Sequence, residues 1–169
     1  RIVGTKEFYC PSGGGSETLL FGQQACRGRG KYITITEGEV DCLSVSAMFE
    51  NKYDVVSVRN GAASAVKEIK AQLEFLEGYD TVVLALDNDK AGQQASKDIQ
   101  DLFSPGKLKL IKMGQRKDPN EYLMSGDARA FIKDWWDSRD FTPEGIINGG
   151  DLWERLVEYR KVASVPYPW

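Results

Sequence analysis

Apolar and polar positions alternate along the chain in two distinct rhythms. Short apolar runs typical of buried strands occupy residues 32–37, 54–58, 81–86 and 108–111. The segments between them repeat apolar residues every three or four positions, as helices do, at residues 41–51, 64–77 and 90–103. Strands alternating with helices of this length predict an α/β fold, an open parallel four-stranded sheet with helices on both faces.

The chain continues beyond this alternation with further helical patterns. One covers residues 128–138 and is rich in Trp, and another covers residues 151–160. The closing VPYPW contains two prolines and cannot continue a helix, so a linker is expected there. Residues 11–16, PSGGGS, have the composition of a flexible loop.

Composition limits the classes of protein that fit. The length of 169 residues suits one domain with an appendage, and no apolar run approaches the roughly 18 residues of a membrane span. The chain has no His and three Cys without a CxxC pair, which argues against a structural zinc site and indicates reduced thiols in an intracellular setting.

Charge is distributed unevenly along the chain. Residues 1–31 hold five basic and two acidic side chains, a net charge of +3, whereas the whole chain carries −3, so the remainder carries −6. A basic arm beside an acidic body fits a protein that meets a polyanion at one edge and binds cations elsewhere. Ordinary surface charge explains the same asymmetry equally well.

Acidic side chains follow two of the predicted strands. Glu37 closes the first strand in EGEVD (37–41), and Asp87 and Asp89 close the third in LDND (86–89). If the first and third strands are neighbours, these acids face each other where ligands bind in open parallel sheets. Three carboxylates within about 5 Å stay ionised only with a positive partner, and a divalent cation that prefers oxygen ligands would supply it. Asp41 lies one helical turn along and can point to the same place.

A structural explanation exists for each acid taken alone. Glu39 or Asp41 could cap the helix that follows the first strand, and Asp87 or Asp89 the helix that starts near residue 90. Asp118 precedes Pro119 and could likewise start a helix. The neighbouring pair of Arg116 and Lys117 could meet a phosphate or remain solvated.

Three ordered motifs resemble the signatures of the TOPRIM domain: TEGEVD (36–41), LDNDKAG (86–92) and KDPNE (117–121). That domain is shared by bacterial-type primases, type IA and type II topoisomerases, and some nucleases and recombination proteins. Within the group the chain looks most like the primase half of phage-type primase–helicases, whose mitochondrial relative is Twinkle. The glycine-containing turn at 57–62, Phe21-Gly22 and FTPEG at 141–145 add to this likeness.

The resemblance implies a division of the chain. Residues 1–31 would be the remnant of an N-terminal primase subdomain, 32–125 the catalytic core, 126–148 a helical extension and 149–169 the start of a linker. A zinc-binding module would precede Arg1 and a helicase would follow Trp169. No nucleotide-binding G-x-x-x-x-G-K-[ST] loop occurs within the chain itself.

The resemblance also implies roles for individual residues. Glu37 and Asp41 match catalytic acids. The metal ligands would be Glu37, Asp87, Asp89 and Asp118, holding Mg²⁺ or Mn²⁺, as two ions. Nucleotide or DNA contacts are expected from Lys6 by resemblance, and from charge at Arg27, Arg29, Arg59, Arg116 and Lys117, since acids that suit metal repel DNA.

The function expected is therefore that of a DNA primase, a nucleotidyltransferase that makes short RNA primers on single-stranded DNA from ribonucleoside triphosphates. The setting expected is the bacterial cytoplasm during phage infection rather than a mitochondrion or plastid. Three alternatives stay open: a topoisomerase, which needs a tyrosine nucleophile; a nuclease with the same acids; and a primase-like DNA-binding or scaffold module.

Overall fold

The computed structural model describes residues 19–114, 116–140, 152–153 and 156–157. Five strands form one sheet in the order β2-β1-β3-β4-β5, with bounds β1 Gly30–Thr36, β2 Asp54–Ser57, β3 Tyr79–Ala85, β4 Leu108–Leu110 and β5 Arg139–Asp140. The first four are parallel, as predicted, and β1 and β3 are adjacent at the centre. The two-residue β5 pairs antiparallel to β4 and was not predicted, because so short a strand has no periodicity to detect.

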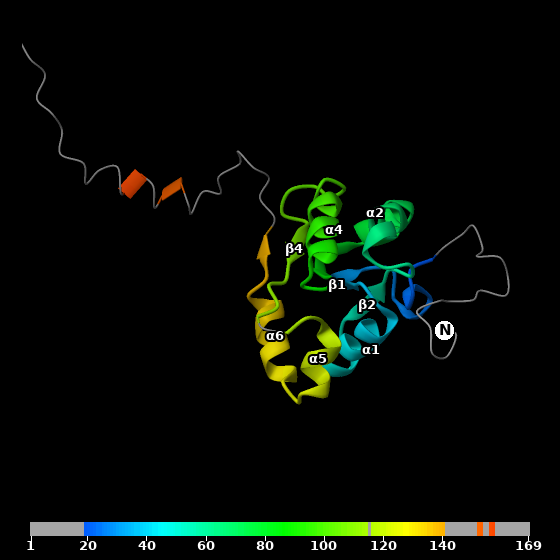
Figure 1. Ribbon diagram of the computed structural model, residues 1–169. Coiled ribbons are helices and arrows are strands. Elements are labelled where there is room, and N and C mark those ends of the chain that lie inside the picture. Colours follow the sequence, from blue (N-terminus) through cyan, green and yellow to red (C-terminus); the bar gives the residue numbers. More distant parts are fainter. Residues whose placement is uncertain (1–18, 115, 141–151, 154–155, 158–169) are drawn as a thin grey trace, which may run out of the picture.

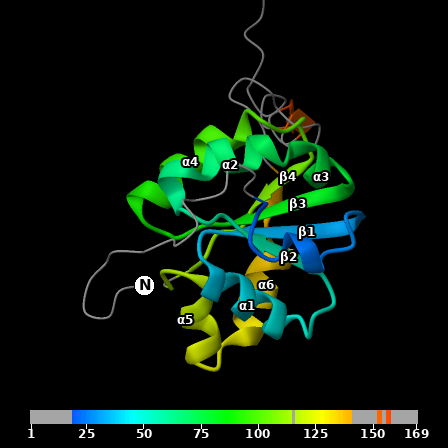
Figure 2. The same ribbon diagram turned by 90° about the vertical axis from the view of Figure 1, so that its right-hand side faces the viewer.

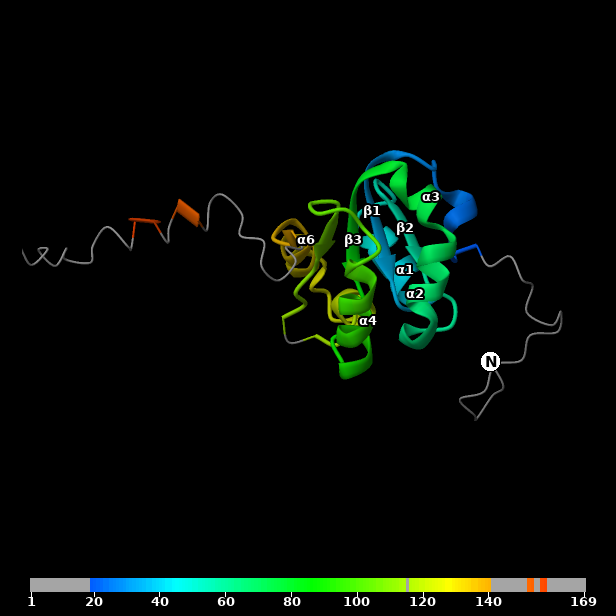
Figure 3. The same ribbon diagram turned by 90° about the horizontal axis from the view of Figure 1, so that it is seen from above.

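Helices cover both faces of the sheet, as the alternation predicts (Figures 1 and 2). One face carries α2 (Ala62–Ala71), α3 (Leu73–Glu77) and α4 (Lys90–Gln100), and α2 and α4 lie side by side (Figure 3). The opposite face carries α1 (Glu39–Met48), α5 (Pro119–Met124) and α6 (Ala128–Trp136).

The predicted helix over 64–77 is two helices. Its backbone leaves the helical region at Gln72, with φ −113° and ψ 18°, so α2 ends there and α3 begins. The Gln72 side chain accepts a hydrogen bond from Gln23 Nε2 at 2.7 Å. That contact comes from a segment 49 residues away, so the spacing of apolar residues within 64–77 could not predict it.

Two apolar cores result from the strand alternation. Ile33 and Ile35 are fully buried and pack with Ile69 of α2 and Ile99 of α4 on one face. On the other face, Trp135 of α6 packs among the aromatic rings and donates from Nε1 to Thr34 Oγ1 at 3.0 Å. With both faces covered, only the ends of the strands remain open to a ligand.

The segment before β1 packs against the edge of the sheet. Leu20 is buried in the core, and Phe21 exchanges two main-chain hydrogen bonds with Ser57 of β2 at 2.9 and 3.1 Å. A short 3₁₀ helix, η1 (Gln23–Ala25), follows. These contacts pair part of the exposed side of β2, an edge strand.

Several predicted features lie outside the described residues: Lys6, the loop at 11–16 and the stretch at 141–145. Of the helix predicted over 151–160, residues 152–153 and 156–157 are described and are helical. Within the described ranges, no helix is long and apolar enough to cross a membrane.

Candidate active site

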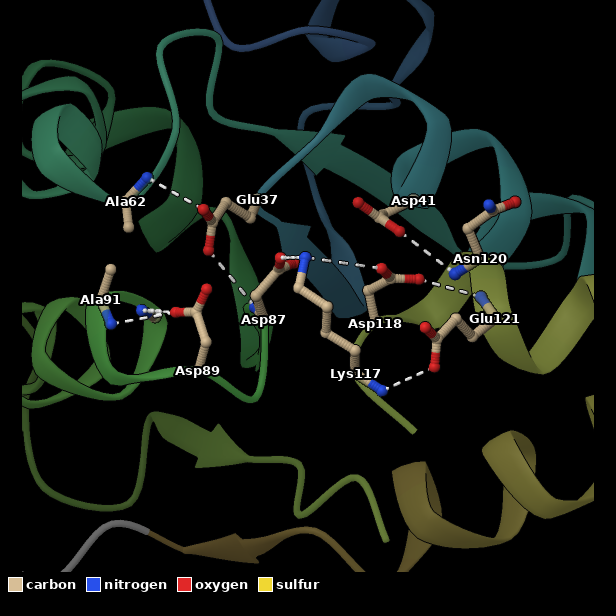
Figure 4. Close-up of polar contacts among 11 residues, drawn as sticks. Glu37, Asp41, Ala62, Asp87, Asp89, Ala91, Lys117, Asp118, Asn120 and Glu121 are labelled. Atoms are coloured by element: carbon tan, nitrogen blue, oxygen red, sulfur yellow. Dashed lines mark hydrogen bonds and ion pairs between the residues drawn. The ribbon is translucent and has the colours of Figure 1, made fainter. Parts of the chain in front are cut away.

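Glu37 follows β1 directly and is held by two main-chain donors. Its Oε1 accepts from Ala62 N at 3.3 Å, and its Oε2 accepts from Asp87 N at 3.4 Å (Figure 4). The donors come from the turns after β2 and β3, the strands on either side of β1. Glu37 thus sits at the centre of the carboxyl ends of the sheet, where ligands bind in this architecture.

The sheet brings Glu37 and Asp87 together as the sequence predicts. Thr36 pairs with Ala85, so the chain after β1 and the chain after β3 leave the sheet side by side. Burial raises the pKa of Glu37, and the charges of Asp87 and Asp89 raise it further. A cation would relieve this crowding of negative charge.

Asp41, in the first turn of α1, is a second acid whose pKa is raised. Its Oδ1 accepts from Asn120 N at 3.1 Å. Burial, with smaller contributions from Asp118 and Asp87, raises its pKa to about 6. Gly38 has an ordinary φ of −124°, but a Cβ there would lie 2.7 Å from Asp41 Oδ2. The glycine makes room for the carboxylate.

Asp89 and Asp118 both cap helices, the structural explanation weighed for each. Asp89 Oδ1 accepts from Ala91 N and Gly92 N, both at 2.9 Å, at the start of α4. Asp118 Oδ1 accepts from Glu121 N at 2.9 Å at the start of α5. In each carboxylate the capping bonds use one oxygen, and Oδ2 takes no part in them.

Lys117 supplies the positive charge of this site. Its Nζ lies 2.7 Å from Asp87 Oδ2 and 3.9 Å from Asp118 Oδ2, and the Asp87 contact raises the lysine pKa (Figure 4). Its main chain is fixed on both sides: Lys117 N donates to Glu121 Oε2 at 2.9 Å, and Asn88 N donates to Lys117 O at 2.8 Å. The backbone is fastened while the side chain is more than half exposed.

The predicted metal ligands do not form a ready cage. Within the described ranges, no three His, Cys, Asp or Glu side chains stand close enough to hold an ion. The donor chemistry nevertheless fits a divalent cation. Glu37 and Asp87 are neighbouring oxygen donors at the strand ends, and the raised pKa values of Glu37 and Asp41 reflect desolvation and uncompensated charge.

The predicted nucleic-acid contacts are scattered. Arg59 is exposed in the turn after β2, and Arg116 pairs with Asp127 ahead of α6. Arg27 and Arg29 precede β1, so they lie at the opposite end of that strand from Glu37. Seven residues at about 3.3 Å each separate the two ends by roughly 20 Å.

Some site groups gave no signal in the sequence. The main-chain donors Ala62 N and Asp87 N are invisible to any reading of residue types. Asn120 and Glu121 of KDPNE fasten Asp41 and the Lys117 backbone, but only their place in the motif pointed to them. Glu68 lies on the buried face of α2 between Ala65 and Ile69, where a carboxylate interrupts an apolar stripe. That interruption was a usable signal.

Comparison of the sequence with known proteins identifies relatives of this chain. The sequence profile of the family described as Toprim-like matches residues 34–123. The chain is 32% identical over 129 residues to the DNA helicase/primase of Enterobacteria phage T3, covering 76% of this chain and 23% of that protein. The chain therefore spans less than a quarter of the length of that curated relative.

Two solved structures share the fold at similar identity. The primase fragment of the bacteriophage T7 primase-helicase is 33% identical, with a TM-score of 0.65, over 69% of this chain and 48% of that one. A primase domain in the complex of the T7 lagging-strand DNA polymerase with two such domains, an RNA/DNA hybrid and dTTP is 32% identical, with a TM-score of 0.67, over 72% and 61%.

Proposed function

The chain belongs to the Toprim-like family, and from that premise we propose that it is the catalytic part of a DNA primase, joining ribonucleotides into short RNA primers on single-stranded DNA. The observation that carries the proposal is the pairing of Glu37 with Asp87 at adjacent strand ends, in a chain 33% identical to a phage primase fragment. The proposal needs both the site geometry and the sequence similarity, because a fold alone does not fix a function.

The chemistry proposed is phosphoryl transfer. A primer 3′-hydroxyl attacks the α-phosphate of an incoming triphosphate, and pyrophosphate leaves. Asp87 and Glu37, together with Asp89 and Asp118, would hold a divalent cation, which would supply charge neutralisation there. We assign Mg²⁺ or Mn²⁺, as two ions.

The residues of this chain have separable parts in that reaction. In this proposal Glu37 accepts the hydroxyl proton, and its orientation by two main-chain donors supports that role. Lys117 pairs with Asp87 before the substrate arrives and can then turn its exposed ammonium to a phosphate. Arg59 is an exposed cation close along the chain to the Ala62 donor, and we assign it to the template or nucleotide phosphates.

The partners proposed extend beyond what the names of the phage relatives state. They are a single-stranded DNA template, ribonucleoside triphosphates, and a zinc-binding module and a helicase in the same parent chain. The place of action proposed is the bacterial cytoplasm during phage infection.

The topoisomerase alternative finds little support among the described tyrosines. Tyr79 and Tyr122 are buried and donate their hydroxyls to Asp54 and Asp134, both at 2.7 Å. Burial and the Asp134 contact raise the pKa of Tyr122 to about 12, which disfavours a phenolate nucleophile.

Incubating the chain with labelled ribonucleotides, Mg²⁺ and single-stranded DNA that carries a second, distinguishable label separates the remaining functions. The chain is tested alone and fused to the zinc-binding and helicase modules of a phage primase–helicase. Labelled oligoribonucleotides support the proposal; shortened DNA identifies a nuclease, and neither product identifies a scaffold.

Active-site variants make the test specific. Glu37→Gln and Asp87→Asn each remove a charge from the metal site, so primer synthesis should fall by about 10²-fold or more. Glu39→Gln is the matched control, because Glu39 is exposed, two residues from Glu37, and at the start of α1. Equal loss in all three variants would contradict the assignment.

A further inference from the structure

Glu68 is a buried carboxylate outside every acidic motif. It lies on α2, is only 4% exposed, and accepts three hydrogen bonds. Its Oε2 accepts from Arg59 N at 2.7 Å, and its Oε1 accepts from Asn60 Nδ2 at 2.7 Å and Ser64 Oγ at 3.0 Å. Burying a carboxylate is costly unless donors compensate it, and here the donors come chiefly from one short turn.

That turn joins β2 to α2 and reaches the catalytic acid. Gly61 has φ 71° and ψ −172°, a backbone conformation that side-chain-bearing residues rarely adopt, and Ala62 N beside it donates to Glu37 Oε1. Glu68 fastens positions 59 and 60 before this point and position 64 after it. The Ala62 donor is thus held between two attachments to one buried side chain.

We propose that Glu68 is a positioning residue: it holds the turn at 59–61 so that Ala62 N–H stays on Glu37 and Arg59 stays at the rim of the active site. The inference rests on the proposed function in taking Glu37 as a metal-binding catalytic acid. Glu68 itself is buried and cannot contact a substrate, so it acts only through the turn.

Besides the bonds to Glu68 and Glu37, the turn is fixed by Ser64, whose N and Oγ donate to Gly61 O at 3.2 and 3.4 Å. These two bonds act after Arg59 and Asn60, so Glu68 is what holds the earlier part of the turn. Arg59 and Asn60 are exposed, and a glycine follows them. Without Glu68 the glycine permits other backbone conformations, and Glu37 loses one of its two donors for part of the time. A misoriented Glu37 binds a cation less well, in the way that loss of an outer partner weakens other metal sites.

The test compares Glu68→Ala with Glu68→Gln in the full chain. Alanine removes all three acceptor contacts. Glutamine can keep them: its Oε1 faces Arg59 N, while the Asn60 amide flips and the Ser64 hydroxyl turns to accept from the new NH₂. Glu74→Ala is the control, because Glu74 is exposed on the neighbouring α3.

Two measurements decide the outcome. Free Mn²⁺ is counted by electron paramagnetic resonance to give the affinity, and hydrogen exchange reports the Ala62 amide. Glu68→Ala should weaken Mn²⁺ binding about 10-fold and speed exchange at Ala62, while Glu68→Gln and Glu74→Ala stay near wild type. Faster exchange with unchanged Mn²⁺ affinity would overturn the positioning role and leave a local structural one.

A second variant guards against misfolding of Glu68→Ala. Asn60→Ala combined with Ser64→Ala keeps Glu68 but removes two of its three donors, so the same changes should appear in smaller measure; their absence would also count against the proposal. The Mn²⁺ readout does not depend on RNA synthesis. Weakened Mn²⁺ binding in a chain that makes no primers would therefore uphold the positioning role and refute the primase function.

Discussion

Asp87 is the residue on which the charges of the site converge. Its main-chain N–H holds Glu37, its carboxylate receives Lys117, and its charge raises the pKa of both Glu37 and Asp41. A site organised this way resists ionisation of all its acids at once. Two predictions at the scale of single residues follow from this coupling.

The first concerns the pH dependence of stability without metal. The folded-state pKa of Asp41 is about 6, above its ordinary value of 3.8, so between these values the folded chain holds a proton that the unfolded chain releases. Lowering the pH from 7 to about 4.5 should therefore increase the free energy of unfolding, by about 1 to 2 kcal/mol from this group after discounting solvent screening.

Urea unfolding in EDTA across this pH range measures the effect. Asp41→Asn has no carboxyl to titrate and should lose that part of the increase, although Glu37 contributes in the same direction. An identical pH profile in wild type and Asp41→Asn would show that Asp41 is not the group responsible.

The second prediction concerns Lys117, whose ammonium pairs with the Asp87 carboxylate where a metal cation would otherwise bind. Lys117→Met should tighten Mn²⁺ binding by a few fold, because the ion no longer competes with an ammonium, while the metal-free protein loses only about 0.5 kcal/mol of stability. Lys70→Met, an exposed lysine at the end of α2, serves as the control. Weaker Mn²⁺ binding in Lys117→Met would indicate that the lysine orients Asp87 rather than competing at it.

At the scale of elements, each acidic motif leads into a helix, and the first two motifs directly follow a strand. EGEVD enters α1, LDNDKAG enters α4 and KDPNE enters α5. The capping roles of Asp89 and Asp118 were readable from the sequence, because cap residues precede helices in a known pattern. The spatial reason for Gly92 in the second motif could not be read from the sequence.

Gly92 lets α4 approach the loop that carries Asp87. A Cβ at this position would lie 2.2 Å from Asp87 O, and a main-chain atom cannot swing aside as a side chain can. Gly92→Ala should cost about 1 to 3 kcal/mol of stability and shift the acids of the loop, lowering Mn²⁺ affinity. Thermal unfolding and Mn²⁺ titration check both effects.

Gly114→Ala provides the comparison for that substitution. Its Cβ would meet only Tyr122 Oη, at 3.9 Å, which is ordinary contact, so little change is expected. Equal effects of the two substitutions would mean that the close approach of α4 to Asp87 is not what Gly92 provides.

At the scale of the whole molecule, the order β2-β1-β3-β4 decides what the acids can do. The alternation of strands and helices predicted a parallel sheet, and strands β1 to β4 are parallel to one another. Arg27 and Arg29 lie at the end of β1 remote from Glu37, so these two arginines and the acids are not neighbours in one pocket. The distribution of charge along the chain shows that basic and acidic residues are separated in the sequence, but it does not show at which end of the sheet each group lies.

The sequence by itself determined the alternation of four strands with helices, the family resemblance and which acids follow β1 and β3, because periodicity, capping and motif spacing are local properties of the chain. The tertiary structure alone decided the contacts between these segments. Glu37 accepts hydrogen bonds from Ala62 N and Asp87 N. Lys117 forms an ion pair with Asp87, and Glu68 of α2 fixes the turn that precedes its own helix. Those contacts join segments 25 to 50 residues apart, or use main-chain groups common to every residue, so no local pattern records them.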